Sequence, residues 1–236
     1  MSYPFVTTAS STVSEAIETR RSVRDFKSDP IAHECIREIL ATASRAASGG
    51  NLQPWKVYVL AGAARDALVQ AVVDSRTERP FGDGPEYPIY PADLTERYQN
   101  RRSRASAQRF DLLGIAREDG EARAAQMSKN FEFFGAPVGM IITIERQMGS
   151  PQFCDLGIFI GNIMLLAREQ GLHTCPQEAW SMWGQTIREQ VGVPDDELVF
   201  CGISIGYAVP DSPVNQLRSE RVQVEEFAVF RGCTEL

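Results

Sequence analysis

The sequence lacks the features that mark metal-binding, secreted and membrane-spanning proteins. Only two histidines occur among its 236 residues, and neither has a cysteine or histidine partner at metal-ligand spacing, so no metal site is expected. No uninterrupted apolar run approaches the roughly 20 residues that span a membrane. The stretch Met1–Phe5 carries neither the basic nor the apolar region of a signal peptide. We therefore expect a cytoplasmic protein without a membrane partner.

Motifs of protein-borne catalysis are also missing. The chain has no Ser/His/Asp order, no GxSxG and no paired carboxylates at a useful spacing. No GxGxxG opens a βαβ unit, which excludes a Rossmann nucleotide site. Positive charge is in the minority, with 24 Lys and Arg against 31 Asp and Glu and a net charge of −7. General binding to nucleic acid or to a membrane surface needs a net basic face and is not expected.

The cysteines include no pair at CxxC spacing, so free thiols are the expected state in a reducing cytoplasm. The five are Cys35, Cys154, Cys175, Cys201 and Cys233. Hydrophobic residues make up 43% of the chain and charged residues 23%, which is typical of a soluble globular protein. No repeat or interdomain linker is visible, so we expect a single domain over residues 1–236. A Pro-, Gly- and Tyr-rich excursion should begin at about residue 78 and end at about 118, and a C-terminal arm should cover about 208–236.

Against this acidic background, one basic cluster stands out at Arg20-Arg21-Ser22-Val23-Arg24. Thr12 and Glu15 form a capping box, so a short helix should end near Arg20 and leave the cluster in a loop. Forked guanidinium donors and a hydroxyl match the oxygens of a phosphate. A solvated basic turn is the alternative. The cluster favours a small, multiply charged anion as ligand.

Patterning predicts the remaining elements. Asp29-Pro30 should cap a helix that ends at about residue 47, and the residues Ser48–Gln53 should break it with two glycines and two amides. Strands are expected at 57–60, 137–144 and 198–207, and further helices at 63–73, 94–113, 119–134, 155–170 and 181–190. The helix over 155–170 is apolar nearly all round, so it should be a central helix or a subunit interface. The arginines of the 94–113 helix should pair with nearby acids such as Asp93, Glu96 and Asp111.

The order of these motifs resembles the nitroreductase family of flavin enzymes. A basic loop is followed by SGGNLQPW and a strand, then by a buried helix that leads to TCPQEAW, then by the strand CGISIGYA and a late basic pair. The likeness extends from Ala16 to about Arg221. The stretch YPIYPADLTERYQNRRSRA is similar to an insertion of the nitrobenzoate-reductase branch.

The resemblance implies an α+β fold, with a mostly antiparallel sheet wrapped by helices, in an intertwined homodimer with FMN at the subunit interface. It implies ping-pong transfer of hydride from NAD(P)H through flavin N5 to nitroaromatic or quinone-like acceptors. No catalytic side chain is then required. A flavin enzyme of another activity on this fold (a reductive dehalogenase, a dehydrogenase or a flavin-fragmenting enzyme) is one alternative. A non-catalytic flavin-binding module and a nucleic-acid binder that uses the Arg97–Arg109 helix are two more.

The same resemblance assigns site residues. The phosphate and the flavin edge would contact Arg20, Arg21, Ser22 and Arg24, with Arg218 and Arg221 completing the phosphate site, although the family often has Lys-x-Arg in place of this Arg-x-x-Arg. The other subunit would supply Ser48, Gly49, Asn51 and Gln53. The reactive face of the flavin would lie against Pro176, Gln177, Glu178 and Ala179. Asp155 is a further candidate for a cofactor-binding residue. Apart from the resemblance, Tyr87 and Tyr90 suggest that the Pro-rich excursion is a substrate-facing lid, with a solvated insertion as the alternative. Trp180 is a further candidate substrate contact, with simple packing as the alternative. His173 and Cys175 are interpreted as structural.

Overall fold

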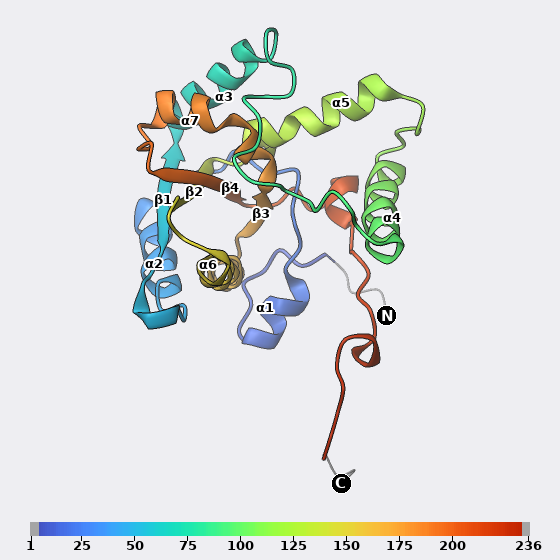
Figure 1. The fold of residues 1–236 in the computed structure, drawn as a ribbon. Coiled ribbons are helices and arrows are strands. Elements are labelled where there is room, and N and C mark those ends of the chain that lie inside the picture. The colour runs from blue at the N-terminus through green and yellow to red at the C-terminus, as the bar shows by residue number, and fades with distance from the viewer. Residues whose placement is uncertain (1–4, 233–236) are drawn as a thin grey trace.

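A four-stranded antiparallel sheet, in the order β1-β2-β4-β3, lies at the centre of the computed structural model, which describes residues 5–232 (Figure 1). The strands are β1 (Trp55–Ala61), β2 (Val138–Glu145), β3 (His173–Gln177) and β4 (Glu197–Gly206). β2 is rich in β-branched residues and is buried on both faces, as expected for a central strand. A register shift between Ile142 and Thr143 bends its pairing with β4. The fold is therefore α+β, as the sequence predicted.

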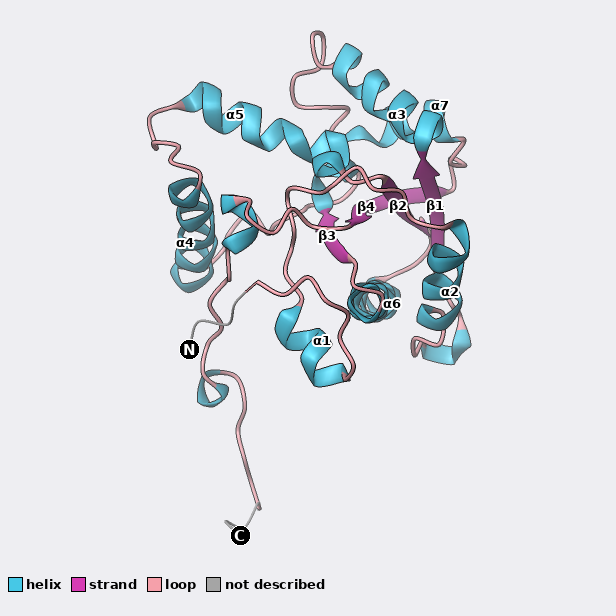
Figure 2. Ribbon diagram, turned by 180° about the vertical axis from the view of Figure 1, so that it is seen from behind, coloured by secondary structure: helices cyan, strands magenta, loops and turns pink. Residues whose placement is uncertain are grey.

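Helices cover both faces of this sheet (Figure 2). Their bounds are α1 (Val13–Thr19), α2 (His33–Ala43), α3 (Gly62–Ser75), α4 (Glu96–Leu112), α5 (Gly120–Ser128), α6 (Ser150–Glu169) and α7 (Gly184–Val191). One core lies between the sheet and α2 with α6, around Ile142, Phe159 and Ile203. A second core lies on the other face, where α3, α7 and the 3₁₀ segments meet the sheet around Ile141 and Trp180. α4 and α5 stand to one side, beyond β3 (Figure 1).

The bounds of several elements differ from the sequence prediction. The predicted cap at Asp29-Pro30 is wrong, because α2 begins at His33 after Ala32 and has no side-chain cap. Residues just before it are held extended: Lys27 N–H donates to the Tyr207 carbonyl at 2.8 Å, and Phe26 bridges Ala208. The chain therefore leaves a sheet-like contact before it can turn into the helix.

The predicted helix over 119–134 is also too long. α5 ends at Ser128, and the following 3₁₀ segment Lys129–Gly135 holds Phe133 and Phe134 in left-handed conformations with φ of 50° and 53°. Phe133 is fully buried, stacks on Trp180 at 4.4 Å between ring centroids, and lies where a Cβ on Gly139 would clash. Burial of an aromatic pair outweighs helical propensity here.

α6 is the helix that organises one face of the molecule. It begins at Ser150, five residues before the predicted start at 155, with Pro151 in its first turn. By length and composition it is the one described helix that would match a membrane span, but it packs on α1, α2 and β3, and a core helix passes the same test. The predicted all-round burial is not met within one chain, because Ile158 is 46% exposed and the positions next to Gly157 and Gly161 are open.

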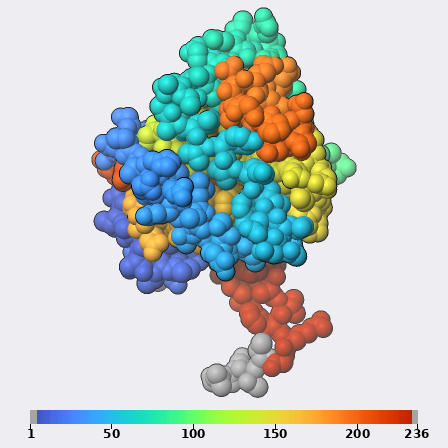
Figure 3. Space-filling model, turned by 90° about the vertical axis from the view of Figure 1, so that its left-hand side faces the viewer, coloured from blue at the N-terminus to red at the C-terminus, as the bar shows by residue number. Residues whose placement is uncertain are grey.

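The C-terminal segment leaves the body of the molecule after the 3₁₀ turn Pro213–Gln216. It runs along α4 and then extends away from the fold (Figures 1 and 3). Its apolar side chains Phe227, Val229 and Phe230 are each at least 67% exposed. Cys233 lies outside the described residues, and the other four cysteines are free thiols.

Candidate functional site

A basic pocket of about 370 Å³ lies between the end of α1, the C-terminal half of α6 and the segment that follows the 3₁₀ turn Pro213–Gln216. Its walls are Ile17, Glu18, Arg20, Arg21, Ser22, Arg24, Leu165, Leu217, Arg218, Ser219 and Arg221. The structure thus brings together all six of the predicted residues from the two basic segments, although nearly 200 positions separate them in the sequence. We call this cavity the arginine pocket.

The backbone fixes the early basic segment against the edge of the sheet. Arg20 ends α1 in an extended conformation, Ser22 bridges Thr174 in parallel, and Val23 N–H donates to the Thr174 carbonyl at 3.1 Å. An extended chain alternates its side chains, so buried Val23 points into the core and its neighbours face the pocket.

Asn215, which lies just before the late basic segment, joins it to the early one. Its side chain is 1% exposed, and its Oδ1 accepts the Arg24 N–H at 2.8 Å. Its Nδ2 donates to the carbonyls of Asp25 at 2.8 Å and Val209 at 2.9 Å. Every polar atom of this amide is therefore used to hold the backbone of the pocket. Sequence inspection missed Asn215, since a lone asparagine in a loop carries no distinguishing signal.

Like charges face one another across the pocket. The pKa of Arg20 is lowered by burial and then by the charge of Arg221, and the pKa of Arg21 is lowered by burial and then by the charge of Arg218. Arg21 is anchored, because its Nη1 donates to the carbonyls of Asn215 at 3.4 Å and Gln216 at 3.1 Å. The guanidinium of Arg20 makes no hydrogen bond or ion pair with residues 5–232. A bound anion would relieve this repulsion, and forked donors suit a phosphate.

The pocket opens into a second cavity of about 700 Å³ beneath α4, which shares Arg24, Leu217 and Ser219 with it. Arg109 and Tyr90 line this second cavity. Cys175 lies behind the junction: burial raises the pKa of its thiol, while the charges of Arg24, Arg109 and Arg20 oppose that rise. A fully buried thiol with a raised pKa is a packing residue, in agreement with the structural interpretation.

The segment Pro176–Ala179 continues from this junction at the end of β3. The Gln177 side chain is 3% exposed and is satisfied internally, by the Asn130 carbonyl at 2.7 Å and the Ser204 hydroxyl at 2.6 Å. It braces the segment and does not face a cavity. Glu178 lies near Tyr87, where burial raises the pKa of both groups.

The loop Ser48–Gln53 does not reach the arginine pocket within one chain. Gly49 N–H donates to the Asp155 carboxylate at 3.1 Å near the start of α6, whereas Leu165 lines the pocket. Ten helical residues separate these two points, which is about 15 Å along the axis. Asn51 and Gln53 adopt positive φ of 58° and 50°, and Gln53 Nε2 donates to the Asn51 carbonyl at 3.2 Å. Asp155 is 9% exposed and ties this loop to α6.

The predicted substrate residues fall in different surroundings. Tyr90 is 49% exposed and lines the second cavity. Tyr87 stacks on Phe200 at 5.4 Å and donates to the Phe200 carbonyl at 2.5 Å, so its hydroxyl is already engaged. Trp180 is fully buried between Phe133 and Gly202, a placement that favours the packing alternative over a substrate contact.

The arginines of α4 correct another expectation. Two of them form ion pairs, but with acids of the C-terminal segment: Arg101 with Glu226 at 3.2 Å and Arg104 with Glu220 at 3.0 Å. The nearby acids of the sequence are not the partners. Arg109 instead lines the second cavity, which the interpretation of α4 as a solvated basic helix did not anticipate.

No group of three or more His, Cys, Asp and Glu side chains that would hold a metal ion occurs within residues 5–232.

Comparisons with known proteins agree with this geometry. A model of the Nitroreductase family matches residues 17–207. A nitrobenzene nitroreductase of Ectopseudomonas oleovorans is 38% identical over 218 residues, which cover 92% of this chain and 96% of that protein. A 4-nitrobenzoate reductase of Pseudomonas putida is 35% identical over 216 residues, covering 92% and 94%.

Solved structures extend the likeness to the whole fold. The FMN and NADPH-dependent nitroreductase NfnB of Sphigopyxis sp. strain HMH superimposes with a TM-score of 0.91 and 40% identity, over 94% of this chain and 100% of that one. The FMN-dependent nitroreductase NfnB of Mycobacterium smegmatis, solved in complex with NADPH, gives a TM-score of 0.88 and 30% identity, over 92% and 97%.

Proposed function

The chain belongs to the Nitroreductase family, and we propose on that premise that it is an oxidoreductase that reduces nitroaromatic compounds with NAD(P)H, using bound FMN. Nitrobenzoate-like acceptors are the expected class, with quinone-like acceptors as a further one. The observation that carries the proposal is the arginine pocket, where basic segments from the two ends of the chain meet.

The residues present fit the phosphate end of FMN. Arg20, Arg21 and Arg24 approach from one side and Arg218 and Arg221 from the other, and burial with mutual repulsion lowers the pKa of the first two. Arg221 is held by the carbonyls of Ser219 and Glu220 at 3.2 and 2.9 Å. A phosphate dianion would replace repulsion by charge-assisted hydrogen bonds.

The chain's own side chains bind and orient and do not act as acid or base. When bound, FMN supplies the redox chemistry that links NAD(P)H to the nitro acceptor. When FMN is bound, Arg24 or Arg21 would supply positive charge beside its ring, and such a charge would stabilise the anionic reduced form. The segment Pro176–Ala179, which is braced through the buried Gln177 side chain, would lie against the reactive face of the bound ring. The N–H of Glu178 or Ala179 is our candidate donor to the flavin ring.

A homodimer would complete this site. α6 leaves a strip with Ile158, Gly157 and Gly161 open, and small residues let a second backbone approach closely. The Ser48–Gln53 loop is bound to α6 at Asp155, about 15 Å along the helix axis from Leu165 in the pocket. We therefore propose that the loop serves the partner's flavin through Ser48, Gly49, Asn51 and Gln53. Exposed Phe227 and Phe230 on the arm would dock on the partner.

The remaining proposals concern the chain as a whole. We propose a single domain with the excursion at about 78–118 and the arm at about 208–236 as its appendages, in a cytoplasmic enzyme without nucleic-acid or metal partners. The alternative function is that of a non-catalytic protein that binds flavin without turning over a substrate.

An absorption spectrum of the purified protein tests the function. We expect a flavin spectrum that bleaches with anaerobic NADPH and returns when 4-nitrobenzoate or nitrobenzene is added. A protein that binds FMN but is not reduced by NADPH would indicate a binding module instead. A colourless protein that does not take up FMN would contradict the whole assignment.

A further inference from the structure

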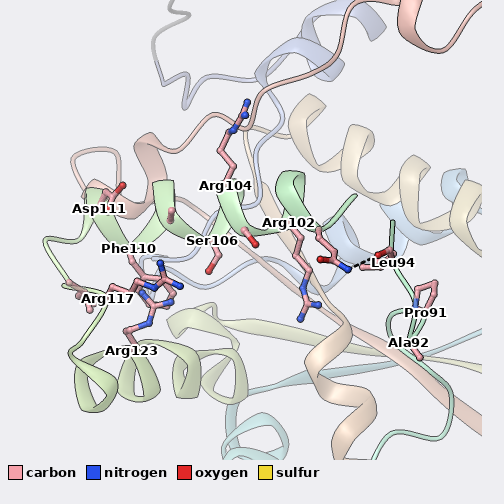
Figure 4. Close-up of a pocket in the computed structure, with 14 residues that line it drawn as sticks. Pro91, Ala92, Leu94, Arg102, Arg104, Ser106, Phe110, Asp111, Arg117 and Arg123 are labelled. Carbon is pink, nitrogen blue, oxygen red and sulfur yellow. Dashed lines mark hydrogen bonds between the residues drawn. The ribbon is translucent and has the colours of Figure 1, made fainter. Parts of the chain in front are cut away.

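A second basic surface lies outside the arginine pocket, under α4. A cavity of about 800 Å³ between α4, the loop at 91–94 and the start of α5 adjoins the second cavity and shares Arg102, Ser106, Phe110 and Arg123 with it (Figure 4). Arg109 lines the inner end, next to Arg24. We call the surface formed by Arg102, Arg109 and Arg123 with Tyr90 and Phe110 the arginine groove.

Aromatic rings hold these guanidinium groups in place. Arg123 lies 3.7 Å and Arg109 4.8 Å from the centroid of the Phe110 ring, and Arg102 lies 4.2 Å from the centroid of the Tyr90 ring. Stacking occupies the face of a guanidinium and leaves its edge donors available. A planar fork fixed in this way loses little rotamer entropy when it binds a phosphate.

The groove also lacks compensating charge. Arg102, Arg109 and Arg123 form no ion pair within residues 5–232, whereas Arg101 and Arg104 on the same helix each do. Arg109 Nε is buried without a hydrogen-bond partner, and its pKa is lowered by burial and then by the charges of Arg24 and Arg123. The one carboxylate that lines the outer cavity, Asp111, is exposed and pairs with none of these three. The groove therefore attracts an anion.

Size and position point to a nucleotide. The two cavities of about 800 and 700 Å³ fall within the range of ~300–1,000 Å³ that holds drug-sized ligands, and one carboxylate would engage few of the three arginines. The groove also meets the arginine pocket at Arg24, so a ligand in it reaches the cofactor site. We propose that the arginine groove binds the adenosine 2′-phosphate of NADPH and makes this enzyme prefer NADPH to NADH. This inference rests on the proposed function.

Binding of a nucleotide fragment tests the groove without turnover. Adenosine 2′,5′-bisphosphate and 5′-AMP differ only in the 2′-phosphate, and both are titrated calorimetrically into the FMN-loaded protein. We expect the bisphosphate to bind at least about tenfold more tightly, as charge-assisted contacts to a phosphate require. Arg102→Gln and Arg123→Gln should each remove most of that difference. Equal affinity of the two nucleotides for the unaltered protein would overturn the proposal.

The second experiment measures the rapid anaerobic reduction of bound FMN by NADPH or by NADH. No nitro acceptor is present, so the measurement reports on the nucleotide alone. In the two variants, the dissociation constant of NADPH should rise by about tenfold, and that of NADH should change by less than about twofold. Arg97→Gln is the matched control, since Arg97 stacks on Tyr98 at 4.8 Å on the same helix but lines none of the cavities described above.

Selective loss of 4-nitrobenzoate turnover relative to nitrobenzene, with NADPH unaffected, would assign the groove to the acceptor and overturn the proposal. Failure here is distinguishable from failure of the proposed function. A protein that is reduced equally well by both nucleotides and turns over nitroarenes keeps its function and loses only this inference.

Discussion

Two arginine regions lie near the C-terminal end of α6 and use the same side chain in contrasting ways. Arg168 on α6 is fully buried, and its guanidinium is surrounded by acceptors. They are the Thr19 hydroxyl at 3.3 Å, the carbonyls of Leu172 at 3.0 Å, Val6 at 3.3 Å and Thr8 at 2.5 Å, and His173 Nε2 at 3.1 Å. In the arginine pocket, Arg20 instead faces Arg221 across a cavity and has no partner within the described chain.

The difference shows that partners, not residue type, separate a structural arginine from a ligand-binding one. The donors of Arg168 are matched by acceptors of the fold, so its cost of burial is offset within the chain. The donors of Arg20 are left for a ligand, and its charge is a cost to the fold until an anion arrives. Stability should therefore depend on the first region, and cofactor affinity on the second.

Replacing Arg168 should have the largest effect. Arg168→Met keeps an apolar stem but leaves the carbonyls of Val6, Thr8 and buried Leu172 without their donor. We expect the free energy of unfolding of the FMN-free protein to fall by about 3 kcal/mol, because acceptors left without a charged donor cost about 1–3 kcal/mol. Urea unfolding measures it. Arg168→Lys should restore part of the loss, and a loss below about 1 kcal/mol would contradict this role.

Acidification should act on the same region. Burial and the charge of Arg168 lower the pKa of His173 to about 3, below its unfolded value of about 6.5. The unfolded chain therefore takes up a proton as pH falls through about 6.5, the folded chain does not, and stability is lost between these two values. At about pH 5 the loss should be about 2 kcal/mol.

His173→Gln is the matched variant, because it keeps an acceptor for Arg168 and cannot titrate. Unfolding curves for both proteins between about pH 7 and 4 measure the effect. A variant that loses stability as steeply as the parent would show that another group is responsible.

Replacing Arg20 should lower the affinity for FMN and leave the stability of the FMN-free protein nearly unchanged. Arg20→Gln removes a charge that Arg221 opposes, so the FMN-free protein should keep its stability or gain slightly. The dissociation constant for FMN should rise by about tenfold, or about 1.4 kcal/mol, as expected for one lost charge-assisted contact. Fluorescence titration of FMN measures it. Unchanged FMN affinity together with lost stability would place Arg20 in the same class as Arg168.

The sequence was informative where a single segment carries the signal. The α+β fold, the order of the elements and the basic cluster Arg20–Arg24 were all predictable, because each depends on local periodicity or on adjacent residues. The partner acids of α4 were not, since Glu220 and Glu226 come from more than 100 positions away. Arg168 was missed for the same reason: its acceptors are backbone carbonyls, which no sequence pattern reveals.

Tertiary burial also overrode local preference. Phe133 and Phe134 adopt left-handed φ because their rings fill the core, and the helix predicted through them breaks. The Ser48–Gln53 loop is a different case, since it was recognised but lies away from the pocket of its own chain. Its assignment depends on a second copy of the chain, which intrachain geometry does not supply.

A third kind of arginine should show the smallest effect. Arg101 on α4 pairs with Glu226 of the C-terminal segment at 3.2 Å, and both side chains are about half exposed, at 42% and 52%. Water and salt screen such a pair, so Arg101→Gln should change the free energy of unfolding by less than about 0.5 kcal/mol and leave FMN affinity unaltered. Unfolding at low and high salt, with FMN titration of the same samples, measures both. A loss above about 1 kcal/mol would mean that the pair holds the arm in place, and that the contrast between Arg168 and Arg20 omits a structural role for surface charge.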